Sequence, residues 1–261
     1  MKRKIKIWTL RVVLTVIGVS GFLFAIILYP TLTYANKTQY ANFTIYHNQT
    51  LSPNFTSVLD QVNILLKKSD IYSKNLKLDL CLNDGSMYPA IIKTLRGPAF
   101  AWGFYNKIVL QGSLNSQKNY VELNGYKWNL VQLLTHESVH CLQFEKFGLL
   151  DSKPIADIAN WKWEGYAEYI SRQNESQTNL IKNLDRFDQS DENSWEIWLS
   201  DSTICPRDYY RHWNLVHYCI HVKRWSFSEI LQDSTSEKMV FSEMTRWYQI
   251  QKKESRTKTK N

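Results

Sequence analysis

Residues 133–143 read LLTHESVHCLQ, and the centre of this stretch is the five-residue pattern H-E-x-x-H. Residues four apart lie one above the other on a helix, so His136 and His140 can direct two imidazole nitrogens at one point. Two such nitrogens can serve as two ligands of a tetrahedral zinc ion. Glu137, the next residue round the helix, can then take a proton from a water activated by the metal. The stretch therefore predicts half of a zinc site.

The surrounding residues predict a helix from about Leu130 to Phe147, ended by Gly148 as a C-cap. One side of this helix is apolar apart from the two histidines: Leu133, His136, His140, Phe144 and Phe147. Burial removes water, which leaves a metal as the natural partner of the two ring nitrogens. The alternative is an ordinary amphipathic helix on which two histidines happen to lie four residues apart.

A catalytic zinc site usually has three protein ligands, so a third candidate decides between these interpretations. Residues 161–169 read WKWEGYAEY, and Glu164 lies near the start of a second predicted helix that ends at about Arg172. Gly165 and Ala167 are small enough to let this helix pack closely on the first. Alone, the segment could be the start of an unremarkable amphipathic helix, but after HESVH it predicts the third ligand.

HESVH and EGYAEY together resemble the motifs of the gluzincin-type zinc metallopeptidases. There, H-E-x-x-H supplies two ligands and the general base, and a downstream Glu in a similar context is the third ligand. The resemblance covers about Lys107 to Asp233 and implies an α+β zincin-like domain with Zn²⁺ as cofactor. The implied metal ligands are His136, His140 and Glu164.

The resemblance also implies an activity, the hydrolysis of peptide bonds in a peptide or protein substrate. Glu137 would be the general base, and Glu168, one turn beyond Glu164, would orient a zinc-bound imidazole as an outer-shell acceptor. The oxyanion would be held by zinc and by a Tyr or His donor. The segment YYRHWNLVHY offers three candidates for this donor, of which the first fits best by its spacing: Tyr209, Tyr210 and His212.

Two rival interpretations remain open. One is a binding or sensory module that keeps the zincin scaffold without turnover and recognises peptides or cell-wall material with its ten Trp. Glu137 argues against this module, because a site kept only to bind metal does not need a base. The other is a narrow protease that acts on one membrane-proximal partner.

The charge of the chain lies at its ends. The formal net charge is +8, of which residues 1–11 carry +5 and the tail at 252–261 carries +4, so the body is close to −1. A nucleic-acid-binding domain needs a basic face on the fold itself, so we expect no nucleic-acid partner. The Lys-rich tail is predicted to be disordered.

Residues 12–29 contain no charged side chain and would be about 27 Å long as a helix, close to the thickness of a bilayer core. The basic segment 1–11 precedes them, so the positive-inside rule predicts a single-pass signal anchor with the N-terminus in the cytoplasm. The domain would then be extracytoplasmic. The alternative is a signal peptide cleaved after Ala35, which would give a secreted protein.

The polar residues 30–50 are predicted to be a linker, and residues 51–251 to form the peptidase domain. A helix is expected to open at Ser52–Pro53 and run to about Lys68. Five Asn residues begin N-x-S/T sequons, whose use depends on the secretory pathway: Asn36, Asn42, Asn48, Asn54 and Asn174.

Three segments have strand character: residues 76–82, which alternate apolar and polar, and residues 99–105 and 107–111, joined at Asn106. Gly103 permits a bulge or a close backbone approach, so the last two segments can provide the edge strand beside the cleft. There an extended peptide could add itself as a further strand. A simple structural hairpin is the alternative.

Other groups of polar residues have weaker metal-site signatures. His217 and His221 are four apart, but Tyr218 stands where a base would be. An acidic segment lacks the EF-hand spacing and is expected to be a solvated loop: Asp185, Asp188, Asp191, Glu192 and Glu196.

The four cysteines contain no C-x-x-C pair, which argues against a zinc ribbon: Cys81, Cys141, Cys205 and Cys219. A disulfide between the last two and buried free thiols are both consistent with the sequence.

Overall fold

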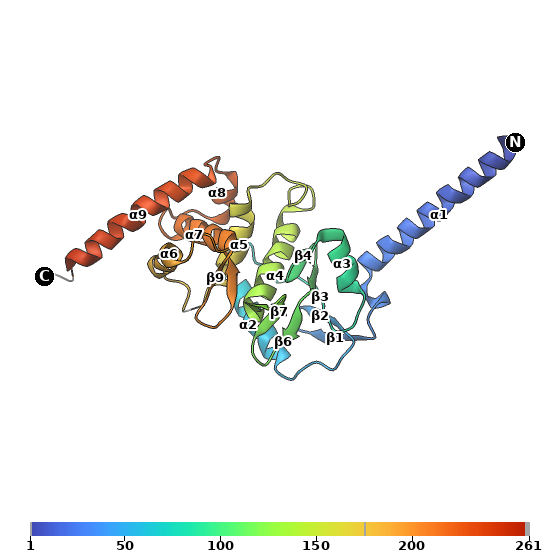
Figure 1. The fold of residues 1–261 in the computed structure, drawn as a ribbon, viewed down its shortest axis with the longest axis horizontal. Helices are drawn as coiled ribbons and strands as arrows, with labels where there is room; N and C mark the ends of the chain where they lie inside the picture. Colours follow the sequence, from blue (N-terminus) through green and yellow to red (C-terminus); the bar gives the residue numbers. More distant parts are fainter. Residues whose placement is uncertain (1, 175, 259–261) are drawn as a thin grey trace.

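The computed structural model describes residues 2–174 and 176–258. It is a mixed α+β domain from which two long terminal helices project on opposite sides (Figure 1), and it confirms the α+β class. The helices are α1 (Lys2–Leu28), η1 (Pro30–Leu32), α2 (Phe55–Leu66), α3 (Tyr88–Arg96), α4 (Leu130–Phe147), α5 (Asn160–Ser171), α6 (Leu180–Gln189), α7 (Arg207–His221), α8 (Phe227–Gln232) and α9 (Glu237–Lys258). The strands are β1 (Asn36–Tyr40), β2 (Phe43–His47), β3 (Leu78–Cys81), β4 (Ala101–Phe104), β5 (Lys107–Leu110), β6 (Ser113–Asn115), β7 (Tyr120–Leu123), β8 (Tyr126–Asn129), β9 (Glu196–Trp198) and β10 (Ile204–Pro206).

The main sheet has five strands in the order β1-β2-β3-β5-β4. The three central strands are parallel, and β1 and β4 are antiparallel to their neighbours. Strands β3, β4 and β5 confirm the predicted strand segments, and β4 lies at the edge of the sheet as expected. Smaller sheets, β6-β7-β8 and β9-β10, lie beside this core.

The two faces of the sheet belong to different cores because successive side chains on a strand point to opposite sides. One face packs with α2 and α4 in the main core through residues such as Ile45, Leu80 and Ile108. The other face packs against α3 and the end of α1 in a smaller core through the next residues along each strand: Tyr46, Cys81 and Val109. Helix α4 therefore lies on the same side of the sheet as the main core.

The first hairpin corrects the linker prediction for residues 30–50. Strands β1 and β2 lie within that segment, and β2 pairs in parallel with β3. Phe43, Ile45 and Tyr46 of β2 are buried. A five-residue strand surrounded by polar residues is too short to show a period, and its pairing partner lies more than thirty residues along the chain. Long-range pairing of this kind overrides local composition.

Helix α1 contains an apolar segment, Trp8–Leu28, that is long enough to cross a membrane or to be a signal sequence. Its last turn is packed into the domain rather than joined by a flexible linker. Ile26 is 7% exposed, and the Tyr88 hydroxyl donates a hydrogen bond to the Ile27 carbonyl at 2.7 Å. The base of α1 is thus held firmly against α3.

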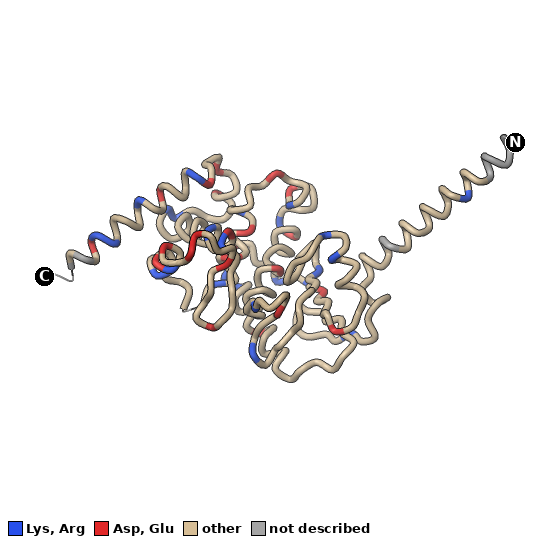
Figure 2. Tube along the Cα trace, viewed as in Figure 1, with Lys and Arg blue, Asp and Glu red and all other residues tan. Residues whose placement is uncertain are grey.

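At the other end, α9 continues to Lys258, into the segment predicted to be a disordered tail, and residues 259–261 lie outside the described part. Helix α2 begins at Phe55, with Asn54 rather than Ser52 as its N-cap residue. Lys and Arg positions recur along α9 (Figure 2), and Lys252 Nζ lies 3.6 Å from Asp185 and 3.5 Å from Asp188 of α6.

All four cysteines are buried free thiols, so Cys205 and Cys219 do not form a disulfide. Burial raises the pKa of both thiols, to about 12 for Cys219. A thiol held in its neutral form behaves as a small apolar side chain, which suits the core positions that these residues occupy.

Candidate metal centre

Helix α4 matches the predicted bounds, and local signals account for both of its ends. The side chain of Asn129 caps the first turn by accepting from the Gln132 amide at 3.2 Å. Gly148 has φ +80° directly after the last turn, a conformation that favours glycine. Between these ends, all residues from Leu130 to Gln143 are buried, so both histidines lie inside the protein.

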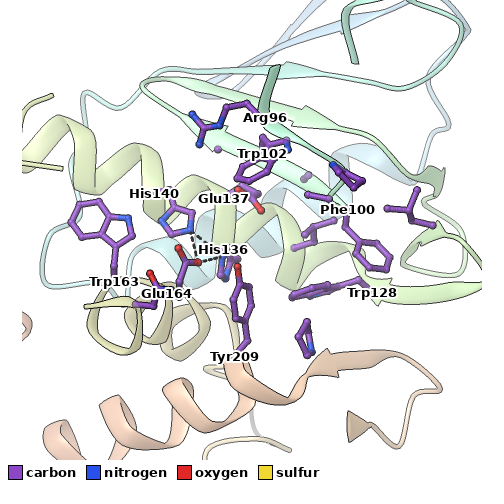
Figure 3. Close-up of a pocket in the computed structure, with 18 of the residues that line it drawn as sticks. Arg96, Phe100, Trp102, Trp128, His136, Glu137, His140, Trp163, Glu164 and Tyr209 are labelled. Atoms are coloured by element: carbon purple, nitrogen blue, oxygen red, sulfur yellow. Dashed lines mark hydrogen bonds and ion pairs between the residues drawn. The ribbon is translucent and has the colours of Figure 1, made fainter. Parts of the chain in front are cut away.

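The three predicted metal ligands come together at the contact between α4 and α5 (Figure 3). His136 Nε2 and His140 Nε2 are 3.0 Å apart, and they lie 3.3 Å and 3.2 Å from Glu164 Oε2. In a tetrahedral site with bonds of ~2.0–2.1 Å, neighbouring ligand atoms are about 3.3 Å apart. The three atoms therefore have nearly the spacing that a shared zinc ion requires.

The far side of each imidazole faces an acceptor. His140 Nδ1 lies 2.8 Å from Gln143 Oε1, and His136 Nδ1 lies 3.0 Å from Glu168 Oε1. An acceptor at Nδ1 favours the tautomer with its proton there, which leaves the lone pair of each Nε2 free. Two lone pairs that face each other cannot form a hydrogen bond. A positive charge between the two nitrogens resolves this contact: a proton on His136, whose pKa is raised, in the metal-free site, or a metal ion bound by both nitrogens. The donor set therefore fits a metal.

Glu168 is held in turn by a fully buried ion pair with Arg172. Arg172 also donates to Gln132 Oε1 at 2.9 Å, which ties this pair to the first turns of α4. Gln143 has a second contact, donating to the Trp163 carbonyl at 3.2 Å. Gln143 and Arg172 were not among the sequence candidates, although their spacings of three and four residues from His140 and Glu168 are helical.

Glu137 lies on the opposite side of the cluster, next to strand β4. A Cβ atom added to Gly103 would lie 2.5 Å from the Glu137 carbonyl and 2.9 Å from its carboxylate. Glycine is thus required for the close backbone approach that the sequence suggests at this position. Burial raises the pKa of Glu137, partly offset by the two histidines and by a hydrogen bond from the Gly103 backbone.

Tyr209 is the candidate donor that reaches the cluster. Its ring stacks on that of His136 with centroids 5.6 Å apart, and its hydroxyl points toward the cluster in Figure 3. The other two candidates point elsewhere. Tyr210 donates to the Asn183 carbonyl at 3.1 Å, and His212 lies 3.5 Å from Glu237. Tyr209 lies in the first turn of α7. Neighbouring residues on a helix face different directions, so Tyr210 and His212 cannot reach the same point.

Helix α7 approaches α5 so closely because of Gly165. A Cβ atom added there would lie 2.6 Å from the His212 carbonyl. This contact corrects the prediction that Gly165 lets α5 pack on α4, because its open side faces α7 instead. The close crossing of α5 and α7 brings Tyr209 within reach of Glu164.

The charges of the cluster are strongly coupled. Burial alone would lower the pKa of His136, but Glu164 and Glu168 raise it above its usual value. Burial would raise the pKa of Glu164, yet the two histidines hold it well below its usual range. The carboxylate of Glu164 and burial keep the pKa of Tyr209 well above its usual range. Tyr209 is therefore a neutral phenol that can donate a hydrogen bond.

A cavity of about 750 Å³ opens over the cluster. Many of the side chains around it are aromatic, and several of them are labelled in Figure 3: Phe100, Trp102, Trp128, Trp163 and Tyr209. Strand β4 forms one wall, so the edge strand borders the cleft as expected. A cavity of this size and apolar character suits an organic ligand held beside a few polar groups.

The other candidate metal sites do not assemble. Within residues 2–174 and 176–258, His136, His140 and Glu164 are the one group of three or more potential ligands close enough to share an ion. His221 Nε2 lies 2.9 Å from the Tyr169 hydroxyl, and burial lowers the pKa of His217 to about 3. Asp185 and Asp188 lie on α6 and face Lys252, so the acidic segment is only partly a loop.

No protein family, curated protein or solved structure matches the chain at a significant level. The chemistry of the site is therefore inferred from its own residues: two imidazoles and a carboxylate in zinc-ligand spacing, a second carboxylate beside them, and a phenol directed at the same point.

Proposed function

We propose that this chain is a gluzincin-type zinc metallopeptidase with a zincin-like domain, anchored in a membrane by α1 with its catalytic domain on the extracytoplasmic side. The observation that carries the proposal is that His136, His140 and Glu164 line the same cavity as Glu137, a carboxylate that is not one of the three candidate ligands. A site that only stored metal would not need this additional base.

The proposed metal ligands are His136 Nε2, His140 Nε2 and a carboxylate oxygen of Glu164. When bound, zinc would polarise the scissile carbonyl and lower the pKa of a water molecule. Glu137 would accept the proton of that water. Tyr209 would donate a hydrogen bond to the developing oxyanion.

Strand β4 would position the substrate. Its outer edge carries no neighbouring strand among the described residues and lines the cavity. An extended peptide can add to such an edge through main-chain hydrogen bonds, which would place a peptide bond across the cluster. The aromatic walls would then contact its side chains.

The proposal is tested with the full chain in detergent. Zinc content should be about one ion per chain, and denatured casein should be cleaved in a chelator-sensitive manner. Glu137→Gln should keep the zinc and lose activity, because the amide has nearly the same shape but cannot accept the proton. Glu164→Gln is the matched control, since it should lose zinc and activity together. A metal-free wild-type protein that is fully folded and active would contradict the proposal.

A binding module on the same scaffold is the second candidate, favoured by the aromatic lining of the cavity. Zinc-loaded protein that binds peptides, yet cleaves neither casein nor a polypeptide segment held at the same membrane, would support this alternative.

A further inference from the structure

Helix α3 packs against the C-terminal end of the apolar segment of α1. Ile26 belongs to the candidate span Trp8–Leu28, yet it is buried in the small core that contains Tyr88 and Ile92 of α3. Figure 1 shows α3 beside the base of α1. If α1 crosses a bilayer, α3 must lie at its surface, because the two helices share this contact.

The outer side of α3 has the composition of a membrane-surface helix. It carries Lys93 and Arg96 and no acidic residue, and Leu95 between them is 59% exposed. Met87, directly before the helix, is 62% exposed. Aliphatic side chains beside cations favour the boundary between acyl chains and lipid phosphates.

The opposite wall of the cleft also exposes aliphatic side chains. Segment 148–159 joins α4 to α5, and Leu149, Leu150 and Ile155 are 57%, 73% and 55% exposed. Lys153 of this segment and Arg96 of α3 line the same cavity, so the two walls face each other across its mouth. In Figure 1 the segment lies on the upper side of the domain, toward which α1 also rises.

We infer that α3 and segment 148–159, here called the cleft rim, rest on the bilayer that α1 crosses. The cleft then opens onto the lipid surface, and its substrates are segments of polypeptides held at the same membrane. The contact follows from the packing of α3 on the anchor and from the exposed aliphatic side chains of both parts of the rim. The substrate class also rests on the proposed peptidase function.

The membrane contact is tested in the full chain, reconstituted into nanodiscs of phosphatidylcholine and phosphatidylglycerol. Nitroxide labels are placed at Leu95→Cys and Leu150→Cys, with Leu149→Cys as a substitute if Leu150→Cys folds poorly. The four native cysteines are buried, so a surface thiol can be labelled selectively. The matched control is Ile64→Cys on α2, where the native side chain is 58% exposed; α2 lies on the other side of the domain from the rim in Figure 1.

Collision with oxygen and with a water-soluble nickel chelate reports the depth of each label. At the rim positions, we expect the ratio of the oxygen collision rate to the nickel-chelate collision rate to be raised to the values found in the headgroup and upper acyl region. At Ile64→Cys we expect this ratio to have the value found for a label in water. Water-like ratios at all three positions would overturn the membrane contact. This measurement does not depend on zinc or on activity.

The substrate class is tested with a single-span reporter that carries identical copies of one casein segment at increasing distance from the bilayer. We expect wild-type protein to cut the nearest copies and to spare the farthest. Equal cutting of all copies would overturn the substrate class. If no copy is cut while the rim labels still report lipid contact, the peptidase function fails and the membrane contact stands.

Discussion

Two adjacent tyrosines on α7 provide a direct test of which side chain assists the proposed reaction. Tyr209 stacks on His136 at the cluster, whereas Tyr210 donates to the Asn183 carbonyl in the core. We expect Tyr209→Phe to keep zinc and KM but to lower kcat by about 100-fold or more, because a lost oxyanion donor weakens binding of the transition state alone.

Tyr210→Phe is the matched control for this prediction. It removes one buried hydrogen bond, so it should cost about 1 kcal/mol of stability and leave kcat unchanged. Steady-state kinetics and zinc analysis on both variants provide the comparison. An unchanged kcat in Tyr209→Phe would remove Tyr209 from the reaction.

His217 makes stability depend on pH. It is 2% exposed, and burial, with His221 beside it, lowers its pKa to about 3. The unfolded chain gains a proton on this residue below about pH 6.5 while the folded chain does not, so stability is lost as pH falls through this window. Between pH 7 and pH 5 the loss from this residue should be about 2 kcal/mol.

Urea unfolding of wild type and His217→Phe at these two pH values measures this contribution. The phenyl ring has no proton to gain, so the variant should lose less stability on acidification. An equal loss in both proteins would show that His217 is not responsible. His217 has no contact with the metal ligands among the interactions of the described residues, so zinc content should not change.

At the level of elements, Gly103 sets the distance between β4 and α4. We expect Gly103→Ala to lower stability by about 1–3 kcal/mol, because the added methyl group would collide with the Glu137 backbone and carboxylate. It should also lower kcat in the folded protein, since Glu137 must move. Gly112→Ala is the matched control, because its methyl group would lie 2.5 Å from Val121 instead.

Denaturant titration and kcat measurements on both glycine variants distinguish packing from catalysis. Loss of stability in both with loss of kcat only in Gly103→Ala is the expected pattern. If kcat falls equally in both, general loosening of the domain explains the effect rather than the position of Glu137.

Sequence reasoning succeeded for elements whose signals are local. Helix α4 was predicted to its end residues because its apolar stripe is long and Gly148 follows it. The β1-β2 hairpin was missed because β2 is stabilised by pairing with β3, which lies far along the chain. Gly165 was predicted to let α5 pack closely on α4, but it faces α7 instead. A small residue shows that a helix can approach a neighbour closely, but it does not show which neighbour.

For the whole molecule, the candidate site joins parts that the sequence presents separately. Spacing within α4 predicted the two candidate histidine ligands, because helical periodicity fixes which side chains share a face. The EGYAEY context after HESVH predicted Glu164 as the third candidate. The sequence offered Tyr209 as the first of three donor candidates and Gly103 as a point of close backbone approach. It could not show that Tyr209 rather than its neighbours reaches the cluster, or that Glu137 is what Gly103 approaches, because these contacts depend on how the helices and the sheet pack. The position of α3 at the base of α1 had no sequence signal for the same reason.

Because the candidate ligands come from α4 and α5, we expect bound zinc to stabilise the fold as well as the site. A ligand that binds only the folded state adds about 2.7 kcal/mol when its free concentration is 100 times its Kd. For a chain of this size we expect chelation to lower Tm by about 5–10 °C. Thermal unfolding with and without chelator, followed by far-UV circular dichroism, measures the shift.

Glu164→Gln should unfold at the same temperature in both conditions, because its site has lost a charged candidate ligand. A chelator effect that persists in Glu164→Gln would mean that the stabilising ion binds elsewhere.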